Sequence, residues 1–238
     1  MPEPIPRPLQ AVFFDAGETL LRPWPSFWQR FVAVAEAHGE TFEAASVEAA
    51  SAAAAREAAW PSDWTDPATQ RAFWGGFYDT ILTRLGHRGD RAELVDALFA
   101  AFTDPAGYKL FDDARPALAT LAGRGLLLGV VSNFEPWLRR ILELEGVTGC
   151  FRAVAISGVL GVAKPDPRIF HAALQQAGVA AEATVHVGDH ADDVAGARAA
   201  GITPVLLDRY DRRPHADSHR VRSLTELVEL LDDAGESS

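Results

Sequence analysis

Reactive side chains follow the ends of short apolar runs in this sequence. Asp15 ends the run AVFF and begins a turn that contains Gly17 and Thr19, and Ser132 with Asn133 ends the run LLLGVVS. A carboxylate can act as a nucleophile, and hydroxyl and amide groups donate hydrogen bonds to anionic oxygens. These segments therefore supply a candidate nucleophile and candidate donors to a negatively charged group.

Two further polar segments follow later apolar runs. Lys164 lies in GVAKPDP, and the run TVHVG leads into GDHADD, which contains Asp189, Asp192 and Asp193. Several ionised carboxylates in one place repel one another, whereas Mg²⁺ accepts carboxylates, water and phosphate oxygens as ligands. A carboxylate nucleophile, hydrogen-bond donors, a cation and acids for Mg²⁺ are together the groups that phosphoryl transfer uses.

The apolar runs before these residues alternate with segments of helical periodicity. Strands are predicted at 11–14, 126–132, 153–157, 184–188 and 204–208, and helices at 114–125, 136–146, 166–178, 193–201 and 223–233. Such alternation predicts an α/β fold with a doubly wound parallel sheet, in which functional residues gather at the carboxyl ends of the strands. We therefore expect the reactive side chains to converge at one edge of the sheet.

Between these segments lies a long region without the alternation. Helices are predicted at 26–39, 46–60, 67–86 and 91–102, separated by Gly, Pro and Asp residues that end helices. The predicted organisation is an α/β core domain of residues 8–22 and 108–234, interrupted by an inserted α-helical bundle of residues 23–107.

Charge and composition exclude some classes of partner. The 238 residues include 33 acidic and 22 basic side chains, a formal net charge of -11, and this argues against binding to nucleic acid through a basic surface. No apolar run approaches the roughly 18 residues of a membrane span, and the leader MPEPIPRPLQ lacks the apolar centre of a signal peptide. We expect a cytoplasmic protein; oligomeric state is not indicated.

Four segments, in order, resemble the motifs of the haloacid dehalogenase-like (HAD) hydrolase superfamily: FFDAGETL, VVSN, KPDPRIF and VGDHADDVAGARAAG. The resemblance covers nearly the whole chain. It implies a Rossmann-like core, with the insert as a helical cap that closes over the site and selects the substrate. It also implies a Mg²⁺-dependent phosphatase that acts on a small phosphorylated metabolite.

The same resemblance implies roles for particular residues. Asp15 would be the nucleophile that forms an aspartyl-phosphate, with Ser132 or Asn133 and Lys164 holding the phosphate. We count Thr19 among the substrate-binding residues as well. The metal ligands would be Asp15, the carbonyl of Gly17, Asp189 and Asp193.

Gly17 departs from the pattern of the superfamily's phosphatases, which usually carry a second Asp at this position as general acid and base. General acid–base catalysis contributes about 10²–10⁴-fold. Three interpretations stay open. In the first, the substrate has a good leaving group. In the second, another residue such as Glu18, His190 or a cap side chain supplies the proton. In the third, the protein binds a phosphorylated ligand with little turnover.

Two relatives with other chemistry also lack the second Asp. Metal-independent haloacid dehalogenases do not need the acidic fourth motif, so GDHADD speaks against them. Phosphonate hydrolases of the superfamily need a cap lysine, and no lysine lies between Asp15 and Lys109. Simpler roles also exist for two residues: Asp192 can favour a helix dipole, and His186 is expected to be a core histidine.

Overall fold

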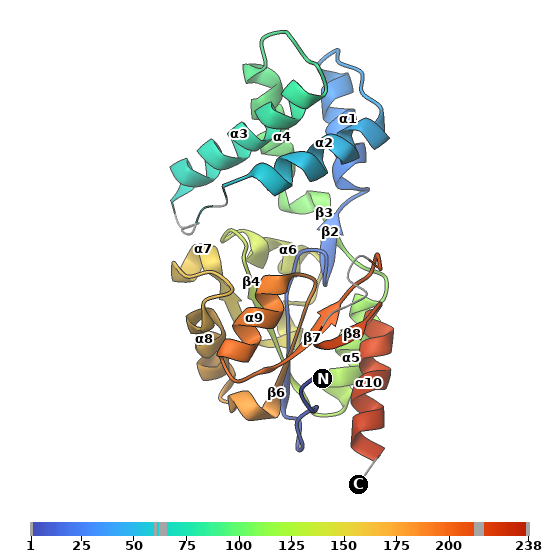
Figure 1. Cartoon of the computed structure of the whole chain (residues 1–238), viewed down its shortest axis with the longest axis vertical. Helices are drawn as coiled ribbons and strands as arrows, with labels where there is room; N and C mark the ends of the chain where they lie inside the picture. Colours follow the sequence, from blue (N-terminus) through green and yellow to red (C-terminus); the bar gives the residue numbers. More distant parts are fainter. Residues whose placement is uncertain (1, 60, 62–65, 212–216, 237–238) are drawn as a thin grey trace. The chain divides into compact units, whose positions relative to one another are not determined.

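The computed structural model describes residues 2–59, 61, 66–211 and 217–236. The chain divides into two compact units (Figure 1). We call Met1–Arg22 with Leu110–Ser238 the core unit, and Pro23–Lys109 the helical unit.

The core unit is built on a six-stranded parallel sheet in the order β5-β4-β1-β6-β7-β8. The strands are β1 (Ala11–Phe14), β4 (Leu127–Ser132), β5 (Phe151–Ile156), β6 (Thr184–Gly188), β7 (Thr203–Leu207) and β8 (His219–Val221). From the central β1 the chain builds one half of the sheet, then returns to build the other half from β6. The carboxyl ends of β4, β1 and β6 therefore meet where the strand order reverses, which is where open α/β sheets bind ligands.

Helices cover both faces of this sheet. Helices α8 (Pro167–Ala177) and α9 (Ala191–Ala199) lie on the opposite side of the strands from α5 (Ala114–Gly123) and α10 (Leu224–Glu236) (Figure 1). The unit also contains α6 (Leu138–Leu144), the short α7 (Ser157–Leu160) and the 3-10 helices η2 (Thr148–Cys150) and η3 (Ala181–Ala183). The predicted fold class, a doubly wound α/β core, is confirmed.

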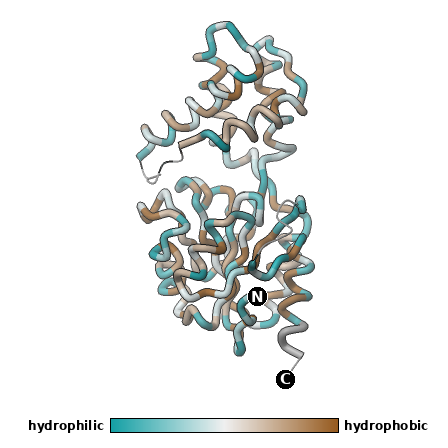
Figure 2. The backbone as a smooth tube through the Cα atoms, in the orientation of Figure 1, coloured by the Kyte–Doolittle hydropathy of each residue, from teal (hydrophilic) through white to brown (hydrophobic). Residues whose placement is uncertain are grey.

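Burial on both faces explains why the strands are continuous apolar runs. All four residues of β1 are fully buried, and Phe13 packs in one cluster with Val131 and with Ile169 and Phe170 of α8. Figure 2 shows the strands of this unit as largely hydrophobic segments. Parallel strands covered on both sides lose the polar alternation of half-exposed strands.

Three short strands were not predicted. They are β8 and the pair β2 (Leu21–Pro23) and β3 (Tyr108–Leu110), which form a separate two-stranded sheet. Three residues are too few to show a hydrophobic period, so these strands depend on their pairing partners rather than on a local pattern.

The helical unit contains α1 (Phe27–Ala37), α2 (Ala44–Glu57), α3 (Pro67–Arg84), α4 (Ala92–Thr103) and the 3-10 helix η1 (Pro105–Gly107). Ser26 caps α1 by accepting a hydrogen bond from the Gln29 backbone, and Asp66 caps α3 ahead of a proline. The helices enclose a core with many aromatic rings. The helix predicted over 46–60 ends at Glu57, and position 60 lies outside the described residues.

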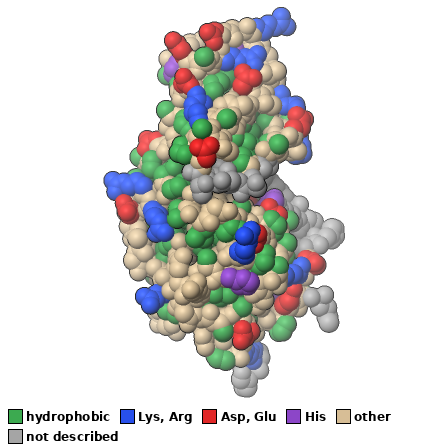
Figure 3. All heavy atoms as spheres, turned by 90° about the vertical axis from the view of Figure 1, so that its left-hand side faces the viewer, with side chains coloured by type: hydrophobic (Ala, Val, Ile, Leu, Met, Phe, Trp, Pro, Cys, Tyr) green, Lys and Arg blue, Asp and Glu red, His purple; other side chains and the backbone are tan. Residues whose placement is uncertain are grey.

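No helix among the described residues is long and apolar enough to cross a membrane. On the face shown in Figure 3, acidic and basic side chains are interspersed rather than gathered into a basic patch.

Candidate functional site

Asp15 and Ser132 meet at the carboxyl ends of two neighbouring strands. Asp15 directly follows β1, and its backbone N–H continues the strand pairing by donating to the carbonyl of Val187 at 2.8 Å. Ser132 is the last residue of β4, and its hydroxyl donates to Oδ1 of Asp15 at 2.9 Å. The structure thus brings together the predicted nucleophile and a predicted hydrogen-bond donor to the phosphate.

Lys164 reaches the same place from the loop between α7 and α8. Its ammonium donates to Oδ1 of Asp15 and to Oδ1 of Asp193, at 2.6 Å each. Only 6% of the residue is exposed, although a lysine is ordinarily solvated. A buried ammonium between two carboxylates is therefore the central ion pair of the site.

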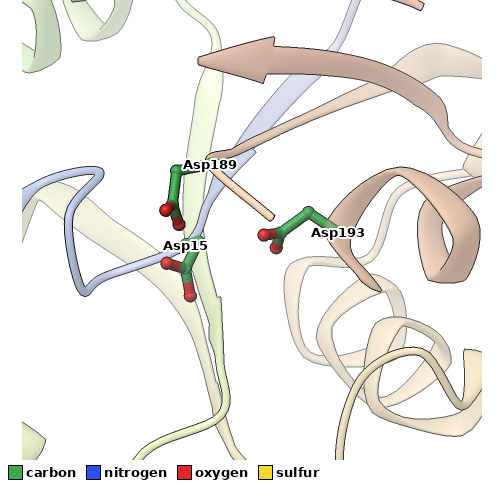
Figure 4. A group of neighbouring side chains, drawn as sticks. All are labelled: Asp15, Asp189 and Asp193. Carbon is green, nitrogen blue, oxygen red and sulfur yellow. The ribbon is translucent and has the colours of Figure 1, made fainter. Parts of the chain in front are cut away.

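Asp189 completes a group of three acids, directly after β6. Carboxylate oxygens of Asp15, Asp189 and Asp193 all lie within 4.8 Å of one another. Figure 4 shows the side chains of Asp189 and Asp193 directed toward Asp15, which follows β1, while Asp189 follows β6 and Asp193 lies in α9. With one ammonium against three carboxylates, the group keeps an excess of negative charge when all are ionised.

The pKa values reflect this excess. Burial raises the pKa of Asp189 to about 8, and the nearby charges of Asp15 and Asp193 act in the same direction. Burial also raises the pKa of Asp15, with Lys164 and Ser132 opposing it in part. Burial also acts to raise the pKa of Asp193, but the Lys164 ammonium and the hydrogen bond with His186 outweigh burial and hold that pKa far below the ordinary value.

Burial acts to lower the pKa of the Lys164 ammonium. The charges of Asp15 and Asp193 outweigh burial, so the net effect is a raised pKa. Lys164 therefore stays charged at neutral pH and acts as a fixed cation for anionic groups.

Asp193 is held by more groups than Lys164 alone. Nε2 of His186 lies 2.8 Å from its Oδ1, and the backbone N–H of His190 donates to its Oδ2 at 3.0 Å. Asp193 and His190 together form a reciprocal cap at the start of α9. His186 is fully buried, so the prediction of a core histidine is confirmed. Its contact with Asp193 was not predicted from the sequence.

Gly188 allows Asp193 to approach the end of β6. A Cβ at position 188 would lie 2.1 Å from Cγ of Asp193, closer than any side chain permits. The glycine is therefore required by the close approach of the acid rather than by a turn.

The turn after Asp15 contains Gly17, Glu18 and Thr19. Gly17 forms an isolated bridge with Leu21, and a Cβ on Gly17 would meet nothing within 4 Å. Glu18 adopts a left-handed φ of 55°, and the hydroxyl of Tyr210 donates to its carboxylate at 3.0 Å. Glu18 is near enough to Asp189 to contribute to the raised pKa of that acid, so it stays a candidate for the missing proton donor.

Thr19 is fully buried, and its hydroxyl has no hydrogen-bond partner within the described part of the chain. Its carbonyl accepts from Nη2 of Arg209 at 2.8 Å. Arg209 also forms a two-pronged ion pair with Asp113 at 2.9 Å, and its guanidinium stacks 4.0 Å from the Phe111 ring centre. Neither Arg209 nor Asp113 was singled out from the sequence, where nothing distinguishes them from other charged residues.

Asn133, a predicted phosphate ligand, directs its side chain to the backbone of Lys164. The Lys164 N–H donates to Oδ1 of Asn133 at 2.7 Å, and Nδ2 of Asn133 donates to the Lys164 carbonyl at 3.0 Å. His190, a second candidate proton donor, uses its ring to accept a hydrogen bond from the Asp192 backbone at 3.3 Å.

The acid cluster fits a hard divalent cation. Mg²⁺ prefers carboxylate and carbonyl oxygens, and a cation among the three acids would offset the burial and repulsion that raise the pKa values of Asp15 and Asp189. Asp193 also binds Lys164, His186 and the backbone of His190. The three acids together are the donor set that agrees with a metal site.

Comparisons with known proteins place the chain in a family. The family profile described as haloacid dehalogenase-like hydrolase matches residues 9–201. Haloacid dehalogenase-like hydrolase domain-containing protein 3 of Danio rerio is 32% identical, with 94% of this chain and 97% of that protein covered. Phosphoserine phosphatase of Thermus thermophilus is 38% identical over 65% of this chain and 64% of its own length.

A solved structure has the same fold. The HAD hydrolase YfnB of Bacillus subtilis, crystallised with magnesium, superposes with a TM-score of 0.76 at 19% identity, covering 94% of this chain and 99% of that one. The matched profile spans all four predicted motifs up to position 201. The chain belongs to the haloacid dehalogenase-like hydrolases.

Proposed function

We propose that this protein is a Mg²⁺-dependent phosphatase that hydrolyses the phosphomonoester of a small metabolite through an aspartyl-phosphate at Asp15. The observation that carries the proposal is the Lys164 ammonium, buried between Asp15 and Asp193, next to the third acid Asp189. A cation beside a carboxylate nucleophile suits an anionic phosphoryl group. Curated relatives named as phosphatases support the same reaction class.

Each step uses side chains of this chain. An Asp15 oxygen attacks phosphorus, a bond forms between them, and the ester P–O bond breaks to release the alcohol. Ser132 and Lys164 donate to the phosphoryl oxygens while charge develops on them. Water then attacks phosphorus, the bond to Asp15 breaks, and inorganic phosphate leaves with the carboxylate restored.

Asp15, Asp189 and the Gly17 carbonyl would hold Mg²⁺, with Asp193 beside them. The ion would neutralise the negative charge that the substrate phosphate adds to the acid cluster. We propose in addition that the helical unit is the substrate-selecting cap.

The leaving alcohol must gain a proton, and Gly17 has no side chain to supply it. Glu18 is the candidate in the adjacent turn, because its charge acts on Asp189. A substrate with a good leaving group, such as an acyl or aryl phosphate, needs no such donor.

A panel of phosphate esters, assayed with Mg²⁺ and with EDTA, tests the proposal. We expect phosphate release that requires Mg²⁺ and is lost in Asp15→Asn but kept in Asp112→Asn, an exposed acid of the same unit. Tight phosphate binding without turnover would instead indicate a phospho-ligand-binding protein. Chloride release from 2-chloropropionate in EDTA would indicate a dehalogenase, and either result contradicts the proposal.

A further inference from the structure

The side chain of Asn133 forms a reciprocal pair of hydrogen bonds with the backbone of Lys164. It accepts from the Lys164 N–H at 2.7 Å and donates to the Lys164 carbonyl at 3.0 Å. The two bonds use both polar atoms of the amide and both polar groups of the Lys164 backbone. In this respect Asn133 acts as a strand neighbour would, although its partner lies in a loop.

The loop that carries Lys164 has few other backbone bonds. It runs from the end of α7 at Leu160 to the start of α8 at Pro167, and Asp166 N–H to Ala163 carbonyl is a bond of the loop with itself. Lys164 is buried, and buried backbone groups require partners. Asn133 provides them from a neighbouring strand end.

The pairing of β4 with β5 brings the two segments together. Ser132 lies opposite Ile156 at the end of that pairing. Beyond it, the Ser157 hydroxyl accepts from the Phe134 N–H at 3.1 Å, and the Gly158 N–H donates to the Phe134 carbonyl at 3.0 Å. Residues after β4 therefore stay beside residues after β5, and Asn133 faces the loop as a result.

We propose that Asn133 is a positioning residue for Lys164 and acts on the phosphate through that lysine. A lysine side chain has a long flexible stem, so the place of its ammonium depends on where its backbone is held. Asn133 fixes the backbone end, and Asp15 and Asp193 fix the ammonium end. The proposal rests on the proposed function insofar as Lys164 binds the phosphate.

Asn133 is itself exposed, and one Nδ2 hydrogen is left over, so direct contact with phosphate is the alternative. The composition of the chain makes the two roles separable. Asn133 is the only asparagine of the 238 residues, and Lys109 and Lys164 are the only lysines. A protein labelled with ¹⁵N-lysine therefore gives two backbone amide signals.

The first measurement compares these signals in the full-length wild type and in Asn133→Ala, with Lys109→Arg to assign them. Loss of the acceptor should move the Lys164 amide signal and speed its exchange with solvent, while the Lys109 signal stays in place as the internal control. An unchanged Lys164 signal in Asn133→Ala overturns the proposal. This result does not depend on turnover, so it stands apart from failure of the Asp15→Asn test.

The second measurement is the affinity for inorganic phosphate in the presence of Mg²⁺. Asn133→Ala should weaken binding about tenfold, the equivalent of about 1.4 kcal/mol. In the Lys164→Met background, which keeps the backbone but removes the ammonium, the same substitution should change affinity less than about twofold. Equal losses in both backgrounds would mean that Asn133 contacts phosphate by itself, and would refute its action through Lys164.

Discussion

Replacement of Asp189 by Asn is expected to stabilise the metal-free protein at neutral pH. Burial and the charges of Asp15 and Asp193 raise the pKa of Asp189 to about 8, against an ordinary value of 3.8. Between these two values the folded state binds the proton more tightly than the unfolded state, so the free energy of unfolding falls as pH rises. Asn has no proton to lose and avoids this decrease.

The size of the effect follows from the same pKa values. From the ordinary pKa to pH 7 is about three pH units, and each unit corresponds to about 1.36 kcal/mol. The free energy of unfolding of Asp189→Asn should therefore exceed that of the wild type by up to about 4 kcal/mol at pH 7 in EDTA. Below about pH 4 the difference should vanish, because both folded and unfolded Asp189 are then protonated.

Urea unfolding followed by circular dichroism at several pH values measures this difference. Asp192→Asn is the matched control, since it makes the same Asp-to-Asn change three residues away. It should cost less than about 1 kcal/mol, because an acid near a helix N-terminus is mildly stabilising. Mg²⁺ should raise the free energy of unfolding of the wild type more than that of Asp189→Asn. The difference should be about 2.7 kcal/mol at a Mg²⁺ concentration 100 times the dissociation constant. A metal-free Asp189→Asn protein that is no more stable than the wild type at pH 7 would refute the reasoning.

Three further outcomes are expected. A Cβ at Gly17 would meet nothing within 4 Å, so an Asp side chain fits there. Gly17→Asp should raise kcat on alkyl phosphates by about 10²–10⁴-fold, and on aryl phosphates by less because their leaving groups need less protonation. A folded Gly17→Asp variant with the wild-type rate on alkyl phosphates would count against a missing acid. Asp113→Asn should cost about 2 kcal/mol of unfolding free energy above pH 4. Burial acts to raise the pKa of Asp113, but the ion pair with Arg209 holds this pKa below the ordinary value. The loss of unfolding free energy in Asp113→Asn should therefore shrink as pH falls through the pKa of Asp113. A loss that persists in acid would contradict this reasoning. Gly188→Ala should lower the free energy of unfolding by about 1–3 kcal/mol and abolish turnover, because the new methyl group displaces Asp193. Gly149→Ala is the control and should keep wild-type turnover, since a Cβ at that position meets nothing within 4 Å. Equal turnover in the two variants would contradict the close approach of Asp193 to Gly188.

The elements that carry the site could be predicted because their signals are local. The run before Asp15 predicted a strand at 11–14, and β1 spans the same residues. The run before Ser132 predicted a strand at 126–132, and β4 begins one residue later. Strands β2, β3 and β8 have three residues each and no local period, so pairing alone defines them.

The contacts within the site could not be predicted in the same way. From the sequence, Asn133 was a phosphate ligand and Asp193 a metal ligand, and these roles stay predictions. The structure adds that Asn133 binds the Lys164 backbone, 31 residues away, and that Asp193 pairs with Lys164 and His186. Such pairs join segments that are adjacent only after the strands have paired.

The sequence by itself determined which reactive residues stand at strand ends, because hydrophobic periodicity and the Gly and Pro breakers act over a few neighbouring residues. Only the tertiary structure decided which two acids pair with Lys164, which acid has its pKa raised to about 8, and which amide side chain binds the backbone of Lys164. Burial and distances across separate strands set these properties, and neither is encoded in any single segment.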